Sequence, residues 1–329
     1  MEDLALSGSE IRKDYRTDSY SIIAPKRGSR PKELGEEDIN KLDISKCPFE
    51  RSNDSLTKEL AKYGEPWEIK VIENVFPELS GNTPFGEFSA ANGLFSSIGG
   101  YGYNEVLIDS QNHLDLFEDF SIDKLIEWLG VLIDREEVLY DRKYIKYVQV
   151  FKNYGGLGGA SLAHPHTQIM AWPILIGTMD AESKIIKKRL KETTKCLYEE
   201  LRDAEAGRLL VDNGNFFAIA PFGSRISAEA MIIPKRHVSY IGDLSNDEKR
   251  DLVSALKSIL ITNIKLYGKH AYNFTIHELK DDPDFHMHLE IYPRLSTFAG
   301  IELGENVFVN TIAPEEYAER FRNTLAVTK

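Results

Sequence analysis

The chain has 329 residues, of which 42% are hydrophobic and 28% are charged, so it is long enough for two domains with buried cores. Its formal net charge of -12 argues against nucleic acid or an anionic membrane as the main partner. It has two cysteines and no long apolar run at the N-terminus. The sequence therefore predicts a cytoplasmic protein without a disulfide framework, a signal peptide or a transmembrane helix.

The first third of the chain contains three stretches that are typical of strands, at residues 20–24, 67–72 and 103–108. Residues 80–102 are rich in Gly, Ser and Asn and predict a long loop. A basic cluster at residues 26–31 includes Arg27 and Arg30, whose guanidinium groups suit phosphate oxygens. The alternative for this cluster is a solvated surface loop.

A helix is predicted from its capping residue Ser121 to about residue 140, and a strand follows at 144–151. The apolar residues of the helix recur on one face, which we expect to be buried. They are Leu125, Trp128, Leu129, Leu132 and Ile133.

Residues 155–170 combine a glycine-rich loop with two histidines. The four glycines allow the backbone to approach an anion closely and to offer amide donors to phosphate oxygens. If residues 164–168 are extended, His164, His166 and Gln168 lie on one face, because the side chains of a strand alternate. This combination suggests phosphoryl chemistry. The alternative is a loop whose two histidines serve only the structure.

The second half of the chain repeats the same order of elements. A long charged helix at residues 178–203 is expected to link the halves, and strands are predicted at 216–221, 229–234, 272–277 and 286–292. Ser245 and Glu248 form a capping box for a helix that ends at Gly268. One histidine precedes the helix in each half, and a His-x-His pair ends each half. We therefore predict a duplicated α+β fold with halves at 1–195 and 196–329.

The two cysteines follow this repeat, because each has a glutamate three residues later. Sulfur, imidazole and carboxylate ligands in a set of four suit tetrahedral zinc, and a closed set would be structural. The alternatives are buried thiols beside unrelated glutamates and, for the second pair, one turn of the linking helix. The two sets are Cys47, Glu50, His113 and His164, and Cys196, Glu199, His237 and His286.

Segments between about residues 11 and 322 resemble the galactose-1-phosphate uridylyltransferase family, the transferase branch of the histidine-triad superfamily. The most specific segment is His164-Pro-His166-Thr-Gln168, in which Gln168 stands where hydrolases of the superfamily have a third histidine. The other matching segments are 12–14, 22–31, 47–49, 74–77 and 110–113.

The resemblance implies two histidine-triad-like halves, each an antiparallel sheet with a helix, that form a continuous or pseudo-twofold sheet. It also implies ping-pong nucleotidyl transfer, in which His166 attacks the α-phosphorus of a nucleotide sugar and a sugar 1-phosphate is expelled. A second sugar phosphate would then accept the nucleotide. Neutral imidazole near pH 7 suits this role.

The family pattern also implies roles for further residues of this sequence. Gln168 would donate to phosphoryl oxygens, and the amides of Gly158–Ser161 with the Ser161 hydroxyl would hold developing charge near His164 and His166. Arg27 and Arg30 would reach a phosphate across the interface of a homodimer. The remaining substrate contacts expected by position are Asn74, Phe151, Asn153, Gly158, Gly159 and Glu302.

Three departures from the family pattern leave alternatives open. Glu50 replaces the second cysteine of the zinc motif, so zinc there would be weaker or absent. The tail at 298–304 keeps a Gly-x-Glu but lacks the residues that bind the acceptor sugar phosphate, and it is more similar to the ADP-glucose phosphorylase branch. Some family members bind a second metal, zinc or iron, through one glutamate and three histidines. The matching residues here are Glu182, His277, His286 and His288, which compete with the Cys196 set for His286.

The leading function is therefore a UDP-glucose:hexose-1-phosphate uridylyltransferase of galactose metabolism, with a uridylyl group carried on His166. The second is a nucleotide-sugar phosphorylase that uses inorganic phosphate as the acceptor. A non-catalytic protein that binds a nucleotide or a metal is the hypothesis from a different class, and the presence of both His166 and Gln168 argues against it.

Overall fold

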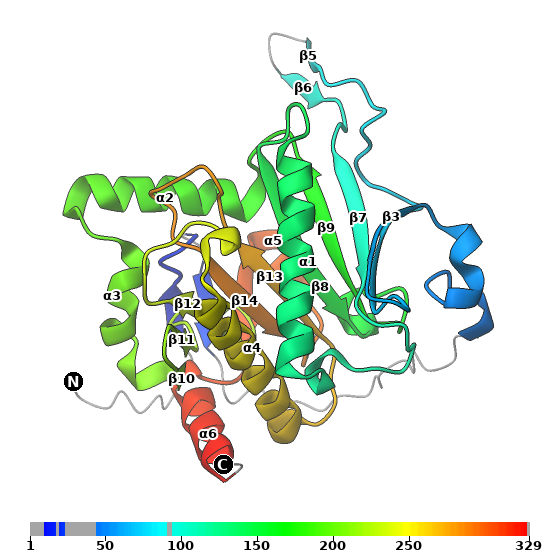
Figure 1. Ribbon diagram of the computed structural model, residues 1–329. Coiled ribbons are helices and arrows are strands. Elements are labelled where there is room, and N and C mark those ends of the chain that lie inside the picture. Colours follow the sequence, from blue (N-terminus) through cyan, green and yellow to red (C-terminus); the bar gives the residue numbers. More distant parts are fainter. Residues whose placement is uncertain (1–9, 18–19, 24–43, 91–93, 328–329) are drawn as a thin grey trace. The chain divides into compact units, whose positions relative to one another are not determined.

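The computed structural model describes residues 10–17, 20–23, 44–90 and 94–327 (Figure 1). The chain divides into two compact units that interleave along the sequence. The unit of residues 40–152 and 162–176 is called the N-half unit, and that of residues 1–39, 153–161 and 177–329 the C-half unit. Each unit contains one of the two His-x-His pairs. The division of the repeat at residue 195 stays a prediction.

The N-half unit is built on five antiparallel strands in the order β3 (Glu59–Tyr63), β4 (Ile69–Glu73), β7 (Tyr103–Ile108), β9 (His166–Trp172) and β8 (Tyr147–Tyr154). Helix α1 (Ile122–Tyr140) packs against β9. The helix begins as predicted, because the side chain of Ser121 accepts a hydrogen bond from the amide of Lys124. Four of the five predicted apolar residues on its face are buried, and Ile133 is half-buried.

The C-half unit contains five antiparallel strands in the corresponding order: β10 (Leu209–Asp212), β11 (Phe216–Ile219), β12 (Ala230–Pro234), β14 (His288–Pro293) and β13 (Tyr272–His277). Helix α4 (Asn246–Tyr267) packs against β11 and β12 and starts at the predicted capping box of Ser245 and Glu248. In each of these two sets of five strands, three precede the helix and two follow it, and the last strand lies between the third and the fourth. The duplicated α+β fold is confirmed.

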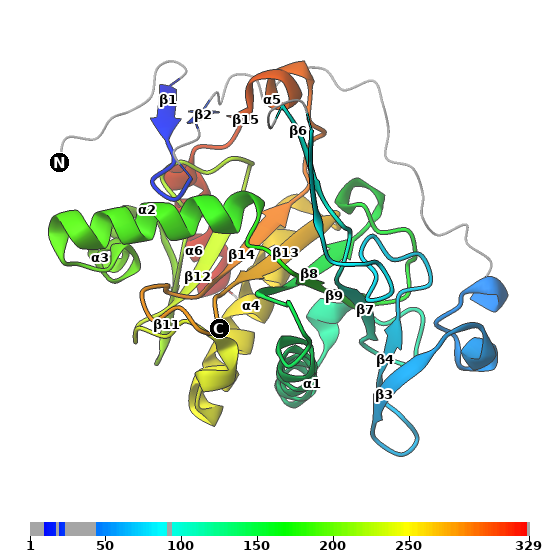
Figure 2. The ribbon, with the colours of Figure 1, turned by 90° about the horizontal axis from the view of Figure 1, so that it is seen from above.

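The C-half unit has additions that the N-half unit lacks within the described part of the chain. Strands β1 (Glu10–Lys13), β2 (Tyr20–Ile23) and β15 (Val307–Asn310) form a separate three-stranded sheet, seen side by side in Figure 2. Helix α5 (Gly300–Glu305) precedes β15, and α6 (Pro314–Ala326) packs against α4. These additions bring the N-terminal residues 12–16 against the second repeat.

Some predicted elements differ from the structure for identifiable reasons. The helix expected at 178–203 is two helices, α2 (Gly177–Thr193) and α3 (Leu197–Ala204), because Thr194 has a φ of 59° and Cys196 caps the second helix. The strand expected from residue 144 starts at 147, since Tyr144 has a φ of 69°. The loop expected at 80–102 contains a hairpin of β5 (Glu87–Ala90) and β6 (Phe95–Ile98). In the described part of the chain, every helix is too short or too polar to span a bilayer.

Candidate active site and metal-binding clusters

His166 begins strand β9, where it pairs with Ile108 of β7. Its Nδ1 lies 2.8 Å from the main-chain carbonyl oxygen of His164. Because a carbonyl oxygen only accepts, Nδ1 is the nitrogen that carries the proton, and Nε2 is left with its lone pair. Burial, followed by the charge of Lys152, lowers the pKa of His166. The local structure therefore supplies a neutral imidazole with one nucleophilic nitrogen.

The ring of His166 is 6% exposed and lies edge-on to Phe49, with 5.3 Å between ring centroids. Gln168, two residues along β9, is half-buried and pairs in register with Phe151 of β8. The predicted site residues Phe151, His166 and Gln168 all belong to the N-half unit.

The glycine loop belongs to the C-half unit and packs against the start of β13. Gly155 has a φ of 76°, and a Cβ atom there would lie 2.6 Å from Cβ of Ala271. The side-chain amide of Asn273 donates to the carbonyl oxygen of Gly158 at 2.6 Å and to Oδ1 of Asn153 at 2.7 Å. These contacts fix the shape of the loop.

Three of the loop amides expected to bind phosphate have hydrogen-bond partners within the loop. The amides of Gly158, Gly159 and Ala160 donate to carbonyl oxygens of Gly155 and Gly156, because the loop closes on itself as a 3-10 turn. Their role toward phosphate oxygens stays a prediction. Ser161 follows the turn and is exposed.

The other predicted contact residues have the following places. Oδ1 of Asn74 accepts from the amide of Phe76, whose side chain is 87% exposed. The carboxylate of Glu302 caps α5 by accepting from the amides of Ala299 and Val309. Arg27 and Arg30 lie outside the described residues.

The first predicted ligand set comes together in the N-half unit, where the four ligand atoms lie within 4.8 Å of one another. One carboxylate oxygen of Glu50 is 3.0 Å from Nδ1 of His113 and 3.4 Å from Nδ1 of His164. Sγ of Cys47 is 3.9 Å from the same His164 nitrogen. Nε2 of His164 donates to the carbonyl oxygen of Ser110 at 2.8 Å, which orients Nδ1 toward the other ligands.

The second predicted set comes together in the C-half unit in the same way. Nδ1 of His286 lies 3.3 Å from Sγ of Cys196, and Nδ1 of His237 lies 3.7 Å from Glu199. Their Nε2 atoms are 2.9 Å from the carbonyl oxygens of Pro283 for His237 and Pro234 for His286. The imidazoles of His164, His237 and His286 are thus turned inward by backbone carbonyls, as in metal sites with an ordered outer shell.

The chemistry of the two ligand sets fits a bound cation. Burial raises the pKa of the thiols of Cys47 and Cys196, so neither thiolate is favoured in the metal-free chain. A bound zinc ion would replace the thiol proton and supply the positive charge that the buried sulfur needs.

A third cluster of possible metal ligands lies in the C-half unit and does not include His286. It consists of Glu182, His277, His288 and Glu290, and not of His286, whose Nδ1 faces Cys196. Glu182 lies 2.9 Å from Nδ1 of His277. Oε1 of Glu182 and Nε2 of His288 have no hydrogen-bond partner among the described residues.

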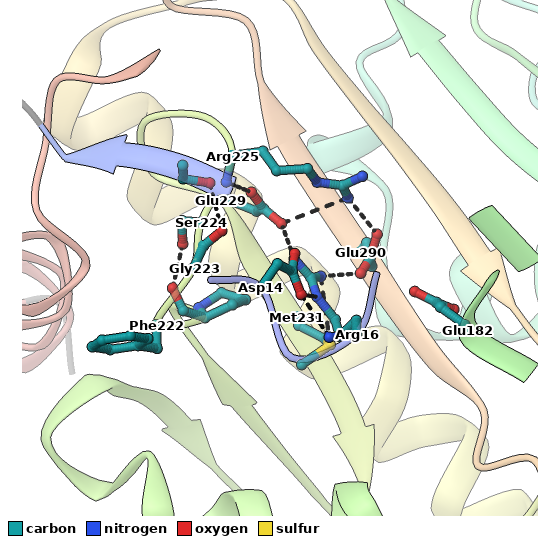
Figure 3. Close-up of polar contacts among 12 residues, drawn as sticks. Asp14, Arg16, Glu182, Phe222, Gly223, Ser224, Arg225, Glu229, Met231 and Glu290 are labelled. Atoms are coloured by element: carbon teal, nitrogen blue, oxygen red, sulfur yellow. Dashed lines mark hydrogen bonds and ion pairs between the residues drawn. The ribbon is translucent and has the colours of Figure 1, made fainter. Parts of the chain in front are cut away.

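Sequence reasoning missed the buried arginines beside this cluster. Figure 3 shows the guanidinium groups of Arg16 and Arg225 directed at the carboxylate of Glu290. Arg16 also bonds Asp14 and Glu229, each at 2.8 Å through Nη2. A charged residue between two polar neighbours at the start of a chain is typical of a surface, so no local pattern indicated this burial.

Known proteins are similar to this chain along nearly its whole length. The profile of the galactose-1-phosphate uridyl transferase N-terminal domain matches residues 3–175, and a domain of unknown function (DUF4921) matches residues 115–329. The ADP-glucose phosphorylase of Arabidopsis thaliana is 31% identical over 326 residues, which cover 95% of this chain and 92% of that protein. The chain belongs to the galactose-1-phosphate uridylyltransferase family.

One further member of the family and one solved structure can be compared. A galactose-1-phosphate uridylyltransferase of Thermotoga maritima is 26% identical over 328 residues, covering 96% of this chain and 98% of that protein. The crystal structure of the Arabidopsis thaliana ADP-glucose phosphorylase with bound ADP-glucose has a TM-score of 0.83 and 28% identity, covering 96% of this chain and 98% of that one. The family assignment made from the histidine motif is confirmed.

Proposed function

We propose that this protein is a nucleotidyltransferase that carries a nucleoside monophosphate on Nε2 of His166. The observation that carries the proposal is the hydrogen bond between Nδ1 of His166 and the carbonyl oxygen of His164, which leaves one nucleophilic nitrogen. Nε2 would attack the α-phosphorus of a nucleotide sugar, and the bond from that phosphorus to the bridging oxygen would break. The electron pair leaves with the sugar 1-phosphate.

The second step restores the histidine. A phosphate oxygen of the acceptor attacks the phosphorus, and the phosphorus–nitrogen bond breaks in favour of neutral imidazole. Gln168 on the same strand would donate to the phosphoryl oxygens, and the exposed Ser161 hydroxyl would supply a further donor.

We propose ADP-glucose as the donor and inorganic phosphate as the acceptor, giving ADP and glucose 1-phosphate. The support is the 31% identity to an ADP-glucose phosphorylase over 95% of the chain, together with the tail at 298–304. The second candidate is uridylyl transfer from UDP-glucose to galactose 1-phosphate. It is supported by the 26% identity to a galactose-1-phosphate uridylyltransferase over 96% of the chain.

The test is intact-protein mass spectrometry after incubation with ADP-glucose or UDP-glucose and no acceptor. A gain of one nucleoside monophosphate that is lost in His166→Ala is the expected result. His270→Ala is a matched control, because Nδ1 of His270 also bonds the carbonyl oxygen two residues before it, at 2.7 Å, outside the motif. An adduct that persists in His166→Ala, or none from either donor, would overturn the proposal.

Adding inorganic phosphate or galactose 1-phosphate to the isolated adduct then identifies the acceptor. Release of ADP by phosphate supports the phosphorylase, and formation of UDP-galactose supports the uridylyltransferase. The base of the adduct and the effective acceptor together assign the reaction.

We further propose that the Cys47 and Cys196 sets each bind one structural zinc ion. Metal analysis of the purified protein is expected to give two zinc ions per chain, and Cys196→Ser is expected to lower the content to one. A third metal at Glu182, His277 and His288, zinc or iron, would raise these contents to three ions per chain in the wild type and two in Cys196→Ser. The homodimer implied by Arg27 and Arg30 is tested by sedimentation.

A further inference from the structure

A network of buried polar side chains contacts the backbone on both sides of His166 in the N-half unit. Lys152 on β8 is 1% exposed, and its ammonium group donates to the main-chain carbonyl oxygen of His166 at 2.8 Å. The same group forms an ion pair with the buried carboxylate of Asp109. A lysine side chain thus bonds the backbone of the proposed nucleophile directly.

Asp109 extends the contacts to both neighbours of His166. Its amide donates to the carbonyl oxygen of Pro165 at 3.0 Å, and its Oδ1 accepts from the hydroxyl of Thr167 at 2.9 Å. The Thr167 hydroxyl in turn accepts from Nε1 of Trp128 on α1 at 3.1 Å. The carbonyl oxygens of residues 164, 165 and 166 are therefore held by His166, Asp109 and Lys152, one after the other.

The repeat allows the same positions to be found in the C-half unit. Leu107 pairs with Thr167, and Ile232 pairs with Leu289, which follows the equivalent histidine, His288. Thr167 therefore corresponds to Leu289. Two residues beyond Leu107 and Ile232, Asp109 corresponds to Pro234.

The position of Lys152 follows from the neighbouring strands. Phe151 pairs with Gln168, so the register places Lys152 opposite Thr167. Ile276 pairs with Leu289 in the C-half unit. Lys152 therefore corresponds to Ile276.

The three polar residues of the N-half unit thus have three buried apolar counterparts, Pro234, Ile276 and Leu289. The C-half unit builds the same order of strands without a buried ion pair at this place. A buried ion pair loses the hydration of both charges, and apolar replacements are often neutral or stabilising. The fold alone therefore does not require Lys152 and Asp109.

We propose that Lys152, held in place by Asp109, is a positioning residue for His166, an inference that rests on the proposed role of His166 as the nucleophile. By fixing the peptide group that follows the imidazole, the pair keeps Nε2 in one direction for in-line attack. Small displacements of a reacting atom have large effects on rate, so a rigid backbone at this residue favours the chemical step.

The test is the double variant Lys152→Met/Asp109→Asn, because a single substitution would leave an unpaired buried charge. The matched control is Arg135→Met/Glu105→Gln, which removes a buried bidentate ion pair of the same unit at 2.8 and 2.7 Å. Both double variants are compared with the wild type in thermal stability and in the single-turnover rate of adduct formation.

We expect the Lys152 variant to form the adduct about 10- to 100-fold more slowly at saturating donor, with the half-saturating donor concentration within about twofold of the wild type. The control is expected to keep the wild-type rate. Equal rates in the wild type and the Lys152 variant, or equal losses in both variants, would overturn the proposal.

A spectroscopic measurement separates this proposal from the proposed function. In protein labelled with 15N-histidine, the ring nitrogens of His166 are expected to shift in the Lys152 variant and to stay unchanged in the control. If the wild type forms no adduct, the proposed function fails, while these spectra still decide the positioning role. Unchanged His166 signals in the Lys152 variant would overturn it.

Discussion

One carboxylate oxygen of Glu50 lies 3.0 Å from Nδ1 of His113, so a carboxylate stands where the resembled zinc motif has its second cysteine. The same oxygen is 3.4 Å from His164. The cluster is thus already arranged around the substituted ligand. A substitution at residue 50 therefore tests how the type of ligand, carboxylate or thiolate, affects metal binding.

Glu50→Cys is expected to strengthen zinc binding, because a thiolate is a softer ligand that zinc favours in structural sites. We expect the affinity to rise about tenfold, equivalent to about 1.4 kcal/mol. Zinc transfer to a coloured chelator measures the change. Glu73→Cys, at an exposed ion pair with Lys58, is the control and should leave the affinity as it was. A Glu50→Cys protein that binds zinc no more tightly than the wild type would contradict the assignment.

Arg16→Met is expected to destabilise the protein by about 3–5 kcal/mol, because it removes the buried cation that contacts three buried carboxylates. Arg16 contacts Asp14, Glu229 and Glu290, all of them buried. Urea unfolding measures the loss. Arg202→Met removes an exposed pair with Asp212 and should cost no more than about 1 kcal/mol. Similar losses of unfolding free energy in the two variants would show that burial of the Arg16 ion pairs does not increase their contribution to stability.

The capping box of α4 should make stability depend on pH. Arg236 bonds both oxygens of Glu248 and, with the Ser245 backbone, lowers the pKa of Glu248 to about 2. An unfolded glutamate titrates near pH ~4.3. The contribution of Glu248 is therefore complete above that value and is lost as the pH falls toward about 2.

Glu248→Gln is expected to cost about 1 kcal/mol at neutral pH, the typical value of a helix cap. The difference in unfolding free energy between wild type and variant should shrink as the pH is lowered below about 4. Denaturant unfolding at pH 7 and pH 3 measures both differences. A gap of the same size at both pH values would argue against this role of Glu248.

The glycine loop can be tested at two positions that share a positive φ. Gly155→Ala is expected to destabilise the protein by about 1–3 kcal/mol, because it combines backbone strain with a clash at Ala271. Gly159 has a φ of 81°, and a Cβ atom there would have no neighbour within 4 Å among the described residues, so Gly159→Ala carries the strain alone. Thermal unfolding should therefore rank Gly155→Ala as the more damaging. The reverse order would mean that the packing of the loop on β13 contributes little.

Clear local signals carried most of the fold prediction. The strands at 103–108 and 272–277 have the predicted bounds, and both are rich in aromatic and β-branched residues, which favour strands. The helix start at Ser121 followed from capping chemistry. Strands β3 and β10 were missed because they are short and lie at an edge, where pairing with a neighbour decides the structure.

The metal-ligand sets of the candidate site could be predicted because they recur at matching positions of the internal repeat. Matching positions of cysteine and histidine in the two halves indicated the ligand sets, and the structure brings both sets together. Lys152 and Arg16 had no such signal, because a sequence does not show that a charged side chain is buried. Their roles depend on partners distant in sequence, such as Asp109 and Glu290.

The different interiors of the two repeats have a consequence for how the protein unfolds. The N-half unit keeps a lysine and a carboxylate where the C-half unit has Ile276 and Pro234. At these matched positions the C-half unit is apolar, so the amide hydrogens of Ile276 and Leu289 should exchange with solvent more slowly than those of Lys152 and Thr167.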